Sequence, residues 1–182
     1  EHLWNETSRM GLRVDVLVNN AGFGTGKDVV DDDPERLEQE VRLNCLAVVG
    51  LTARYLPAMR ERRGGTIINV SSAAAFQPMP HMAVYGATKA FVLSFTEALW
   101  RETRKDGIRV LAVCPGSTDT PFFEVSDEGT VVGRMRSTRQ VLDTTMRALR
   151  TSRPSIVDGL GNAVVARFIT RVLPKRALLA AV

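Results

Sequence analysis

Short β-branched stretches alternate with longer segments of mixed polarity along this chain. Residues 14–18 (VDVLV), 66–70 (TIINV) and 108–114 (IRVLAVC) are each rich in Val or Ile and are followed by residues typical of turns, so we predict three buried strands. A shorter strand is expected at residues 155–157. Strands of this composition, separated by helices, indicate an α/β fold with a parallel sheet that is covered by helices on both faces.

A long helix is predicted between the first two strands. Three aspartates precede Pro34, so that Asp33 can cap the helix and Pro34 can occupy its first position. The helix should end near Gly64 and Gly65, and Pro57 should kink it or mark a join. Further helices are expected at residues 82–105, at residues 139–150 and in the C-terminal region, with a looser segment at residues 117–137.

Composition is that of one globular domain spanning residues 1–182. The chain is 45% hydrophobic and 24% charged, and no apolar run approaches the roughly 18 residues that a membrane-spanning helix needs. The N-terminal residues have neither the basic nor the apolar region of a secretory signal, so we expect a cytoplasmic protein. Cys45 and Cys114 lie in separate apolar segments, which predicts two buried, reduced thiols and no metal site.

The formal net charge of +4 is unevenly distributed. Residues 134–182 contain ten Lys or Arg and two Asp or Glu, whereas the rest of the chain has 14 basic and 18 acidic residues. A basic region can attract nucleic acid or anionic lipid, but few aromatic residues are available to stack on bases. We interpret it as solvated surface and expect no nucleic-acid partner. The apolar and basic stretch 168–176 leaves membrane association as a weak alternative, because it is short and broken by Pro174.

Polar residues gather where the predicted strands end. Residues 19–22 (NNAG), Ser72 and residues 115–116 each follow a strand. Because ligands of parallel α/β sheets bind at the carboxyl ends of the strands, we predict the functional site at this edge.

The chemistry of this site is predicted from Tyr85 and Lys89, which lie four residues apart on one face of a predicted helix. An ammonium group near a phenol lowers its pKa from about 10 towards neutrality, so the phenol can exchange a proton with an alcohol or carbonyl oxygen. Taken alone, a Tyr-x-x-x-Lys pair is more often an ordinary helix-surface pair. Ser72 follows a strand and can donate to the same substrate oxygen, and Asn44 is an amide inside the long helix, either functional or a satisfied polar core residue.

Together these motifs occur in the order and spacing of the NNAG-type short-chain dehydrogenases/reductases, which the chain resembles over at least residues 14–120. The resemblance implies a Rossmann-like, doubly wound parallel sheet. It also implies an NAD- or NADP-dependent oxidoreductase that interconverts a small-molecule alcohol and a carbonyl by hydride transfer.

The resemblance also implies roles for single residues. Tyr85 resembles the catalytic acid/base, and Lys89 the residue that lowers its pKa and holds the nicotinamide ribose. Ser72 resembles the residue that polarises the substrate oxygen, with Ser71 as its rival, and Asn44 resembles the residue that holds a proton-relaying water. Cofactor contacts are implied for Asn19, Ala21, Gly22, Tyr85, Lys89, Pro115, Gly116, Thr118 and Thr120.

Flanking segments are less specific. Pro121, Phe122 and Phe123 resemble a substrate-covering region, with a surface helix as the alternative. His81 and Met82 are expected either to line the pocket or to lie in an ordinary loop.

The dinucleotide-binding fingerprint of the family is missing from this sequence. Residues 22–26 (GFGTG) follow the NNAG strand rather than opening a βαβ unit, so we interpret them as a turn. We therefore expect a chain that lacks the first βαβ unit or units, with an exposed sheet edge, apolar exposure and weak cofactor affinity. The full-length parent is expected to be a homo-oligomer. The alternative function is a truncated, inactive fragment that serves as a dimerisation or binding module through its two long helices.

Overall fold

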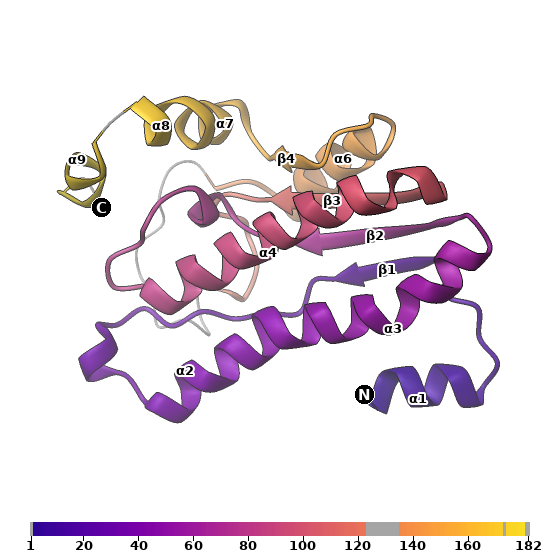
Figure 1. Cartoon of the computed structure of the whole chain (residues 1–182). Coiled ribbons are helices and arrows are strands. Elements are labelled where there is room, and N and C mark those ends of the chain that lie inside the picture. The colour runs from indigo at the N-terminus through magenta and orange to yellow at the C-terminus, as the bar shows by residue number, and fades with distance from the viewer. Residues whose placement is uncertain (1, 123–134, 173, 181–182) are drawn as a thin grey trace.

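A four-stranded parallel sheet forms the centre of the molecule in the computed structural model, which describes residues 2–122, 135–172 and 174–180 (Figure 1). Each strand lies next to the one that follows it in the sequence, in the order β1-β2-β3-β4. The predicted parallel α/β fold is confirmed, with strand positions within about two residues of expectation. The strands are β1 (Val16–Asn19), β2 (Gly65–Val70), β3 (Ile108–Cys114) and β4 (Ser155–Val157).

Helices connect these strands and extend beyond them at both ends of the described chain. The α-helices are α1 (His2–Arg9), α2 (Pro34–Val41), α3 (Ala47–Glu61), α4 (Ala83–Thr103), α6 (Thr138–Leu149), α7 (Leu160–Val164), α8 (Thr170–Val172) and α9 (Lys175–Ala180). Short 3₁₀ turns are η1 (Val29–Asp31), η3 (Ala73–Phe76) and η4 (Arg104–Asp106), and π-helical stretches are η2 (Arg42–Leu46) and η5 (Val165–Ile169).

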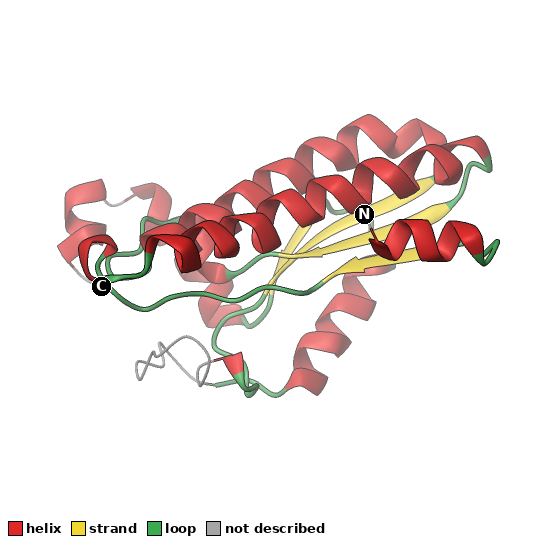
Figure 2. Cartoon of the chain, turned by 90° about the horizontal axis from the view of Figure 1, so that it is seen from below, coloured by secondary structure: helices red, strands yellow, loops and turns green. Residues whose placement is uncertain are grey.

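One face of the sheet is covered by the two longest helices, α3 and α4, which lie side by side (Figures 1 and 2). Strand residues such as Ile67 and Val110 pack there against Met59 of α3 and Leu99 of α4. Trp4 of α1 packs at the margin of the same cluster, so α1 extends this layer. The helix α1 was not expected from the sequence.

The opposite face is covered over only part of its width. Leu111 and Val113 pack there against Ala148 of α6. Val16 and Val18 of β1 alternate with the buried side chains of that strand and are 55% and 53% exposed. The expected exposure of apolar side chains at the β1 edge of the sheet is therefore confirmed. Within the described residues, β1 pairs with β2 alone.

The long helix between β1 and β2 differs in one respect from expectation. Asp33 caps it by accepting a hydrogen bond from the amide of Glu35 at 3.0 Å, as predicted. Of the two outcomes expected at Pro57, a kink or a join, the join was wrong, because α3 continues through Pro57 to Glu61. Instead, the helix widens into the π-helical turn η2 before α3 begins. Turns of this kind inside α-helices are frequent at functional sites.

Three further expectations concern the cysteines, the helices and residues 22–26. Cys45 and Cys114 are buried and are not joined in a disulfide, as predicted. Within the described ranges, no helix combines the length and the apolarity needed to cross a bilayer. The predicted turn at residues 22–26 was wrong, since these residues form an irregular segment, and Gly24 within it lies against Tyr85 of α4.

Candidate active site

Tyr85 and Lys89 lie in the first turns of α4, at the end of the sheet where the strands terminate. Both side chains are buried, and the Lys89 Nζ lies 5.6 Å from the centre of the Tyr85 ring. The prediction that these two residues share a helix face is confirmed, because the ammonium sits over the phenol ring. This arrangement brings a cation next to a group that can carry a proton.

Burial changes the ionisation of Lys89. Its Nζ donates to the carbonyl oxygen of Val70, the last residue of β2, at 3.0 Å. Desolvation lowers the pKa of Lys89 from 10.5 to about 8, while nearby Cys45, Glu40 and Cys114 act in the opposite direction. Lys89 is therefore mostly a cation at neutral pH, but it loses its proton in mildly alkaline solution.

The two serines after β2 have different surroundings. The Ser71 hydroxyl is buried and donates to the carbonyl oxygen of Lys89 at 2.7 Å. Ser72 is half-buried, and its Oγ accepts from the amide of Ala74 at 3.1 Å. A hydroxyl has one hydrogen to give. Ser71 has committed that hydrogen to the backbone, whereas Ser72 can still donate to a ligand.

Asn44 lies in the π-helical turn and is almost fully buried. Its Nδ2 donates to the carbonyl oxygen of Phe23 at 2.8 Å and to the Thr88 hydroxyl at 3.0 Å. Its Oδ1 accepts from the Phe23 amide at 3.2 Å. Asn44 thus joins the segment after β1 to α4, one turn from Tyr85 and Lys89.

Asn19 ends β1 with its side chain turned into the core. Its Nδ2 donates to Oδ1 of Asn69 at 2.8 Å and lies 3.4 Å from the Thr52 hydroxyl. Asn69 continues the network by donating to Thr96 of α4 at 2.9 Å. The side chain of Asn19 therefore braces β1 against β2 and α3, and only its backbone is placed to meet a ligand.

Residues 22–25, which we call the site strap, run between the α2–η2 helix and α4. A Cβ on Gly22 would lie 2.7 Å from Asn44 Oδ1 and 3.4 Å from Lys89 Nζ. A Cβ on Gly24 would lie 2.8 Å from Cδ2 of Tyr85. Both positions require glycine because the strap backbone touches these side chains. The sequence indicated Gly22, whereas the part played by Gly24 was missed.

Glu40 was also missed by sequence reasoning. It is fully buried at the end of α2, and the Thr25 hydroxyl donates to its Oε2 at 3.0 Å. Burial raises the pKa of Glu40 from 4.5 to about 7. The same helix carries the exposed Glu35 and Glu38, so nothing in the sequence pattern distinguished Glu40 from a solvated helix face.

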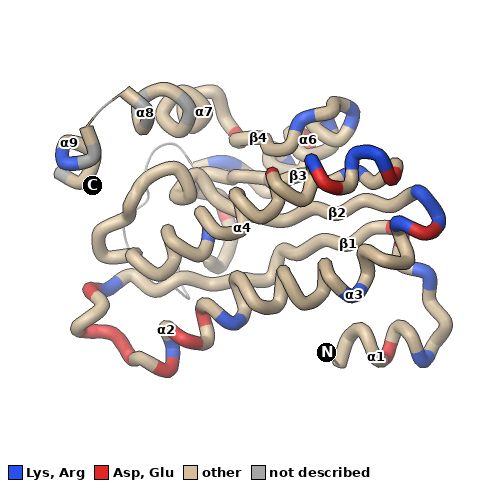
Figure 3. The backbone as a smooth tube through the Cα atoms, in the orientation of Figure 1, with Lys and Arg blue, Asp and Glu red and all other residues tan. Residues whose placement is uncertain are grey.

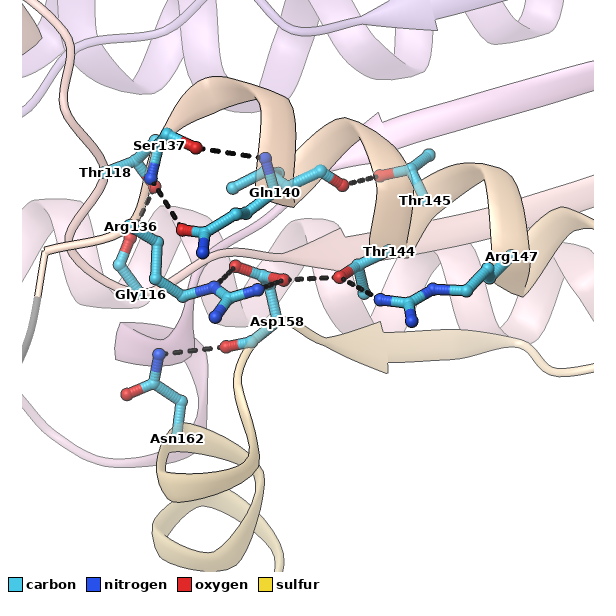
Figure 4. Close-up of polar contacts among 11 residues, drawn as sticks. Gly116, Thr118, Arg136, Ser137, Gln140, Thr144, Thr145, Arg147, Asp158 and Asn162 are labelled. Carbon is cyan, nitrogen blue, oxygen red and sulfur yellow. Dashed lines mark hydrogen bonds and ion pairs between the residues drawn. The ribbon is translucent and has the colours of Figure 1, made fainter.

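The loop after β3 carries the other predicted cofactor contacts. Thr118 forms an isolated bridge with Arg136, and its hydroxyl donates to the Gly116 carbonyl oxygen at 2.9 Å. Arg136 in turn binds both carboxylate oxygens of Asp158, and Asn162 donates to the Asp158 carbonyl oxygen (Figure 4). This network, which joins the loop to β4, α6 and α7, holds the loop beside the sheet edge. The Pro115 carbonyl oxygen accepts from the Ala73 amide. Ala21 and Thr120 are exposed, and the Thr120 hydroxyl lies 3.4 Å from the Thr118 carbonyl oxygen and 3.4 Å from the Phe122 amide.

Of the flanking residues named from the sequence, Phe122 and Met82 lie near the Tyr85 ring, whereas His81 is exposed. The Phe122 ring lies 5.4 Å from that of Tyr85, and the buried Met82 lies against the site strap at Gly24. His81 is exposed, adopts φ 62° and pairs with Asp28 at 2.8 Å. Phe123 lies outside the described residues.

Comparison with known proteins shows the family to which the chain belongs. The model of the short chain dehydrogenase family matches residues 2–130, and the chain belongs to this family. An uncharacterized oxidoreductase of Staphylococcus epidermidis is 33% identical over 116 residues, which are 64% of this chain and 50% of that protein. The very-long-chain 3-oxoacyl-CoA reductase of Bos taurus is 38% identical over 125 residues, 66% of this chain and 40% of that protein. The chain thus spans half or less of these relatives.

Solved structures extend the likeness to the whole chain. A short-chain dehydrogenase from Sphingobium yanoikuyae, solved with NADPH, has a TM-score of 0.83 and 25% identity, and the match covers 100% of this chain and 70% of that one. A short-chain dehydrogenase from Burkholderia cenocepacia, solved with NADP, has a TM-score of 0.82 and 28% identity over 98% of this chain and 74% of that one. The fold is therefore the Rossmann-type α/β fold of this family of oxidoreductases.

Proposed function

We propose that this chain carries the catalytic centre of an NAD(P)-dependent oxidoreductase that interconverts an alcohol and a carbonyl compound. The observation that carries the proposal is the placement of Tyr85 beside the buried Lys89 ammonium, at the carboxyl ends of the strands. Because the chain spans about half of its relatives, the activity, the small-molecule substrate and the cytoplasmic location of the whole protein belong to this proposal.

The residues at the sheet edge fit a nicotinamide dinucleotide. Lys89 has three N–H donors and gives one to Val70, which leaves donors for the ribose hydroxyls. The solved relatives that bind NADPH and NADP support the same cofactor class. The bound cofactor would supply or accept the hydride. Proposed contacts to it are those of Asn19, Ala21, Gly22, Tyr85, Lys89, Pro115, Gly116, Thr118 and Thr120.

In the reducing direction, the residues of this chain orient the carbonyl oxygen and deliver a proton. Ser72 donates a hydrogen bond to that oxygen, using the hydrogen that its contact with Ala74 leaves available. The Tyr85 hydroxyl transfers its proton to the same oxygen as the carbonyl carbon gains hydride, which yields an alcohol and a phenolate. The Lys89 cation stabilises the phenolate, and Asn44 holds the strap beside it. Oxidation reverses each step.

The proposal is tested by comparing the two tyrosines of the chain. Tyr85→Phe should lower the turnover of an NAD(P)H-dependent ketone reduction by about 10³-fold or more and leave cofactor binding, followed by quenching of cofactor fluorescence, within a factor of about two. Tyr55→Phe is the matched control, because Tyr55 makes its 2.8 Å contact with Thr7 on the far side of the core. Turnover by Tyr85→Phe equal to that of Tyr55→Phe would refute the acid/base role.

A second candidate function is a dimerisation module, and the outward faces of α3 and α4 favour it. Exposed or half-exposed positions recur there at helical spacing and are mostly apolar or small: Leu46, Gly50, Ala53 and Pro57 on one helix, and Ala87, Phe91, Ser94 and Ala98 on the other. Leu46 and Phe91 are 62% and 44% exposed. Two adjacent helices with such faces can pack on a second copy as a four-helix bundle.

This second candidate is tested by sedimentation of the chain. A dimer that Phe91→Arg converts to monomer would support it. A wild-type chain that is still monomeric at about 100 μM would exclude it, because its free energy of dimerisation would then be weaker than about 6 kcal/mol. Dimerisation and catalysis are compatible, so the tyrosine comparison decides the activity separately.

A further inference from the structure

A buried carboxylate lies behind the Tyr85–Lys89 pair, and no step proposed above uses it. Glu40 is 0% exposed, and one of its oxygens accepts a hydrogen bond from Thr25. Its other oxygen, Oε1, has no hydrogen-bond partner within the described part of the chain. A buried carboxylate that lacks a full set of donors is costly. The burial of Glu40 at this place therefore points to a role other than stability.

Glu40 and Asn44 lie four residues apart on the continuous helix formed by α2 and η2. Asn44 binds both backbone polar groups of Phe23, and Glu40 binds Thr25. Two neighbouring side chains of one helix therefore hold alternate residues of the site strap. Asn44 holds Phe23 with an uncharged amide group, whereas Glu40 holds Thr25 with a carboxyl group that can change its charge.

The remaining two residues of the strap face the catalytic pair. Gly22 lies between Asn44 and Lys89, and Gly24 lies against the Tyr85 ring and Met82. The strap thus alternates between residues held by the α2–η2 helix and residues in contact with α4. Because Thr25 adjoins Gly24, a change in the Thr25–Glu40 bond acts directly on the backbone that supports Tyr85.

Charges on three sides face Glu40. Asp32, in the acidic segment before α2, raises the pKa of Glu40 beyond the effect of burial, and Figure 3 shows this segment beside α2. Lys89 of α4 and the hydrogen bonds from Thr25 lower it. Cys45 of η2 is also within electrostatic reach, because Glu40 contributes to raising the pKa of its thiol. The balance leaves Glu40 titrating near pH 7, about one pH unit below Lys89.

We propose that Glu40 is a positioning residue for the Tyr85–Lys89 pair, which fixes the site strap through Thr25 and whose negative charge helps to keep Lys89 protonated. Loss of the Glu40 charge weakens the Thr25 hydrogen bond and removes a favourable interaction with the ammonium. The consequence for catalysis rests on the proposed function. The two physical effects belong to the chain itself and can be measured without cofactor or substrate.

The experiment follows the side-chain NMR signals of lysine during a pH titration. The chain has four lysines, Lys27, Lys89, Lys105 and Lys175, so the ε-carbon signals can be assigned with a Lys89→Arg variant. Wild-type Lys89 should titrate near pH 8. In Glu40→Gln, which keeps the shape of the side chain and an oxygen that accepts from Thr25, its midpoint should fall by roughly half a pH unit.

The backbone of the strap provides the second readout. Amide signals of Gly24 and Thr25 should show an inflection near pH 7 in the wild type, and this inflection should vanish in Glu40→Gln. The matched control is Glu38→Gln on the same helix, where an exposed carboxylate pairs with Arg42 at 3.3 Å. Glu38→Gln should leave both signals unchanged.

An unchanged Lys89 midpoint together with an unchanged strap inflection in Glu40→Gln would overturn the proposal. Should that variant fail to fold, Thr25→Val decides. Removal of the hydroxyl that stabilises the carboxylate should move the inflection to higher pH, and no movement would reject the role.

In an active enzyme, Glu40→Gln should also move the alkaline limit of turnover to lower pH. If Tyr85→Phe stays active while these titrations behave as expected, the proposed function fails and the Glu40 assignment stands.

Discussion

Two fully buried carboxylates flank the candidate site, and they are satisfied to different degrees. Asp158, after β4, receives hydrogen bonds from Arg136 on both oxygens, at 2.5 and 3.1 Å, and from Thr144 at 2.6 Å (Figure 4). Glu40 receives the bonds of Thr25 on one side and leaves Oε1 unpartnered among the described residues. Asp158 thus has a charged donor on each of its oxygens, whereas Glu40 accepts from a neutral hydroxyl and burial raises its pKa to about 7.

The difference matches what each carboxylate holds in place. Asp158 anchors the loop after β3, which carries Gly116 and Thr118. Glu40 anchors the site strap, which touches Tyr85 and Lys89. One side of the site is thus built on an ion pair, and the other on a carboxyl group whose pKa is about 7. The predictions that follow test this contrast.

The largest effect is expected from breaking the ion pair. Asp158→Asn leaves Arg136 partly buried without its counter-ion, and should lower the free energy of unfolding by about 3 kcal/mol. Chemical denaturation measures this loss. Asp143→Asn is the control, because its exposed ion pair with Arg139 should contribute less than about 0.5 kcal/mol. Equal effects of the two substitutions would show that Asp158 is not a structural anchor.

A pH-dependent effect of similar size is expected at Glu40. Its folded-state pKa of about 7 lies above the ordinary value of 4.5, so the folded state keeps the proton to higher pH than the unfolded state does. Its contribution to stability is therefore complete below pH 4.5 and is lost as the pH rises through 7. Glu40→Gln should match the wild type near pH 4.5 and be more stable by up to roughly 3 kcal/mol at pH 8. Parallel stability curves for the two proteins would contradict this.

The smallest effect on stability is expected at the two serines after β2, Ser71 and Ser72, whose substitutions should have different consequences. Ser71→Ala removes a buried hydrogen bond to the Lys89 carbonyl and should cost about 1 kcal/mol of stability. Ser72→Ala should cost less stability but reduce turnover by about 10²-fold, since it removes the proposed donor to the substrate oxygen. Thermal melts and steady-state kinetics on both variants test this. A greater loss of turnover in Ser71→Ala would reverse the assignment.

The sequence predicted the parts of the molecule that follow regular patterns. Val and Ile stretches located the strands, Asp33 and Pro34 located the start of a helix, and four-residue spacing placed Tyr85 and Lys89 on one face. These features depend on local geometry and on the burial of apolar side chains. Such rules can be applied to a single chain without knowledge of its tertiary contacts.

The features that the sequence did not predict depend on tertiary contacts. Glu40 lies in a helix that also carries the exposed Glu35 and Glu38, and only its burial in the folded chain raises its pKa to about 7. The π-helical turn at Asn44 and the close approach of Gly24 to Tyr85 likewise arise from packing between segments far apart in the chain. A spacing rule cannot find them, because their partners lie on other elements.

The account depends most on Tyr85, and transfer of an isotope tests it directly. The chain is incubated with nicotinamide cofactor deuterated at C4 and a panel of ketones, and deuterium in the alcohol product is measured by mass spectrometry. We expect wild type and Tyr55→Phe to transfer deuterium to the carbonyl carbon, and Tyr85→Phe to do so about 10³-fold more slowly. Equal transfer by both variants, or no transfer by the wild type from NADH or NADPH, would contradict the proposed catalytic centre.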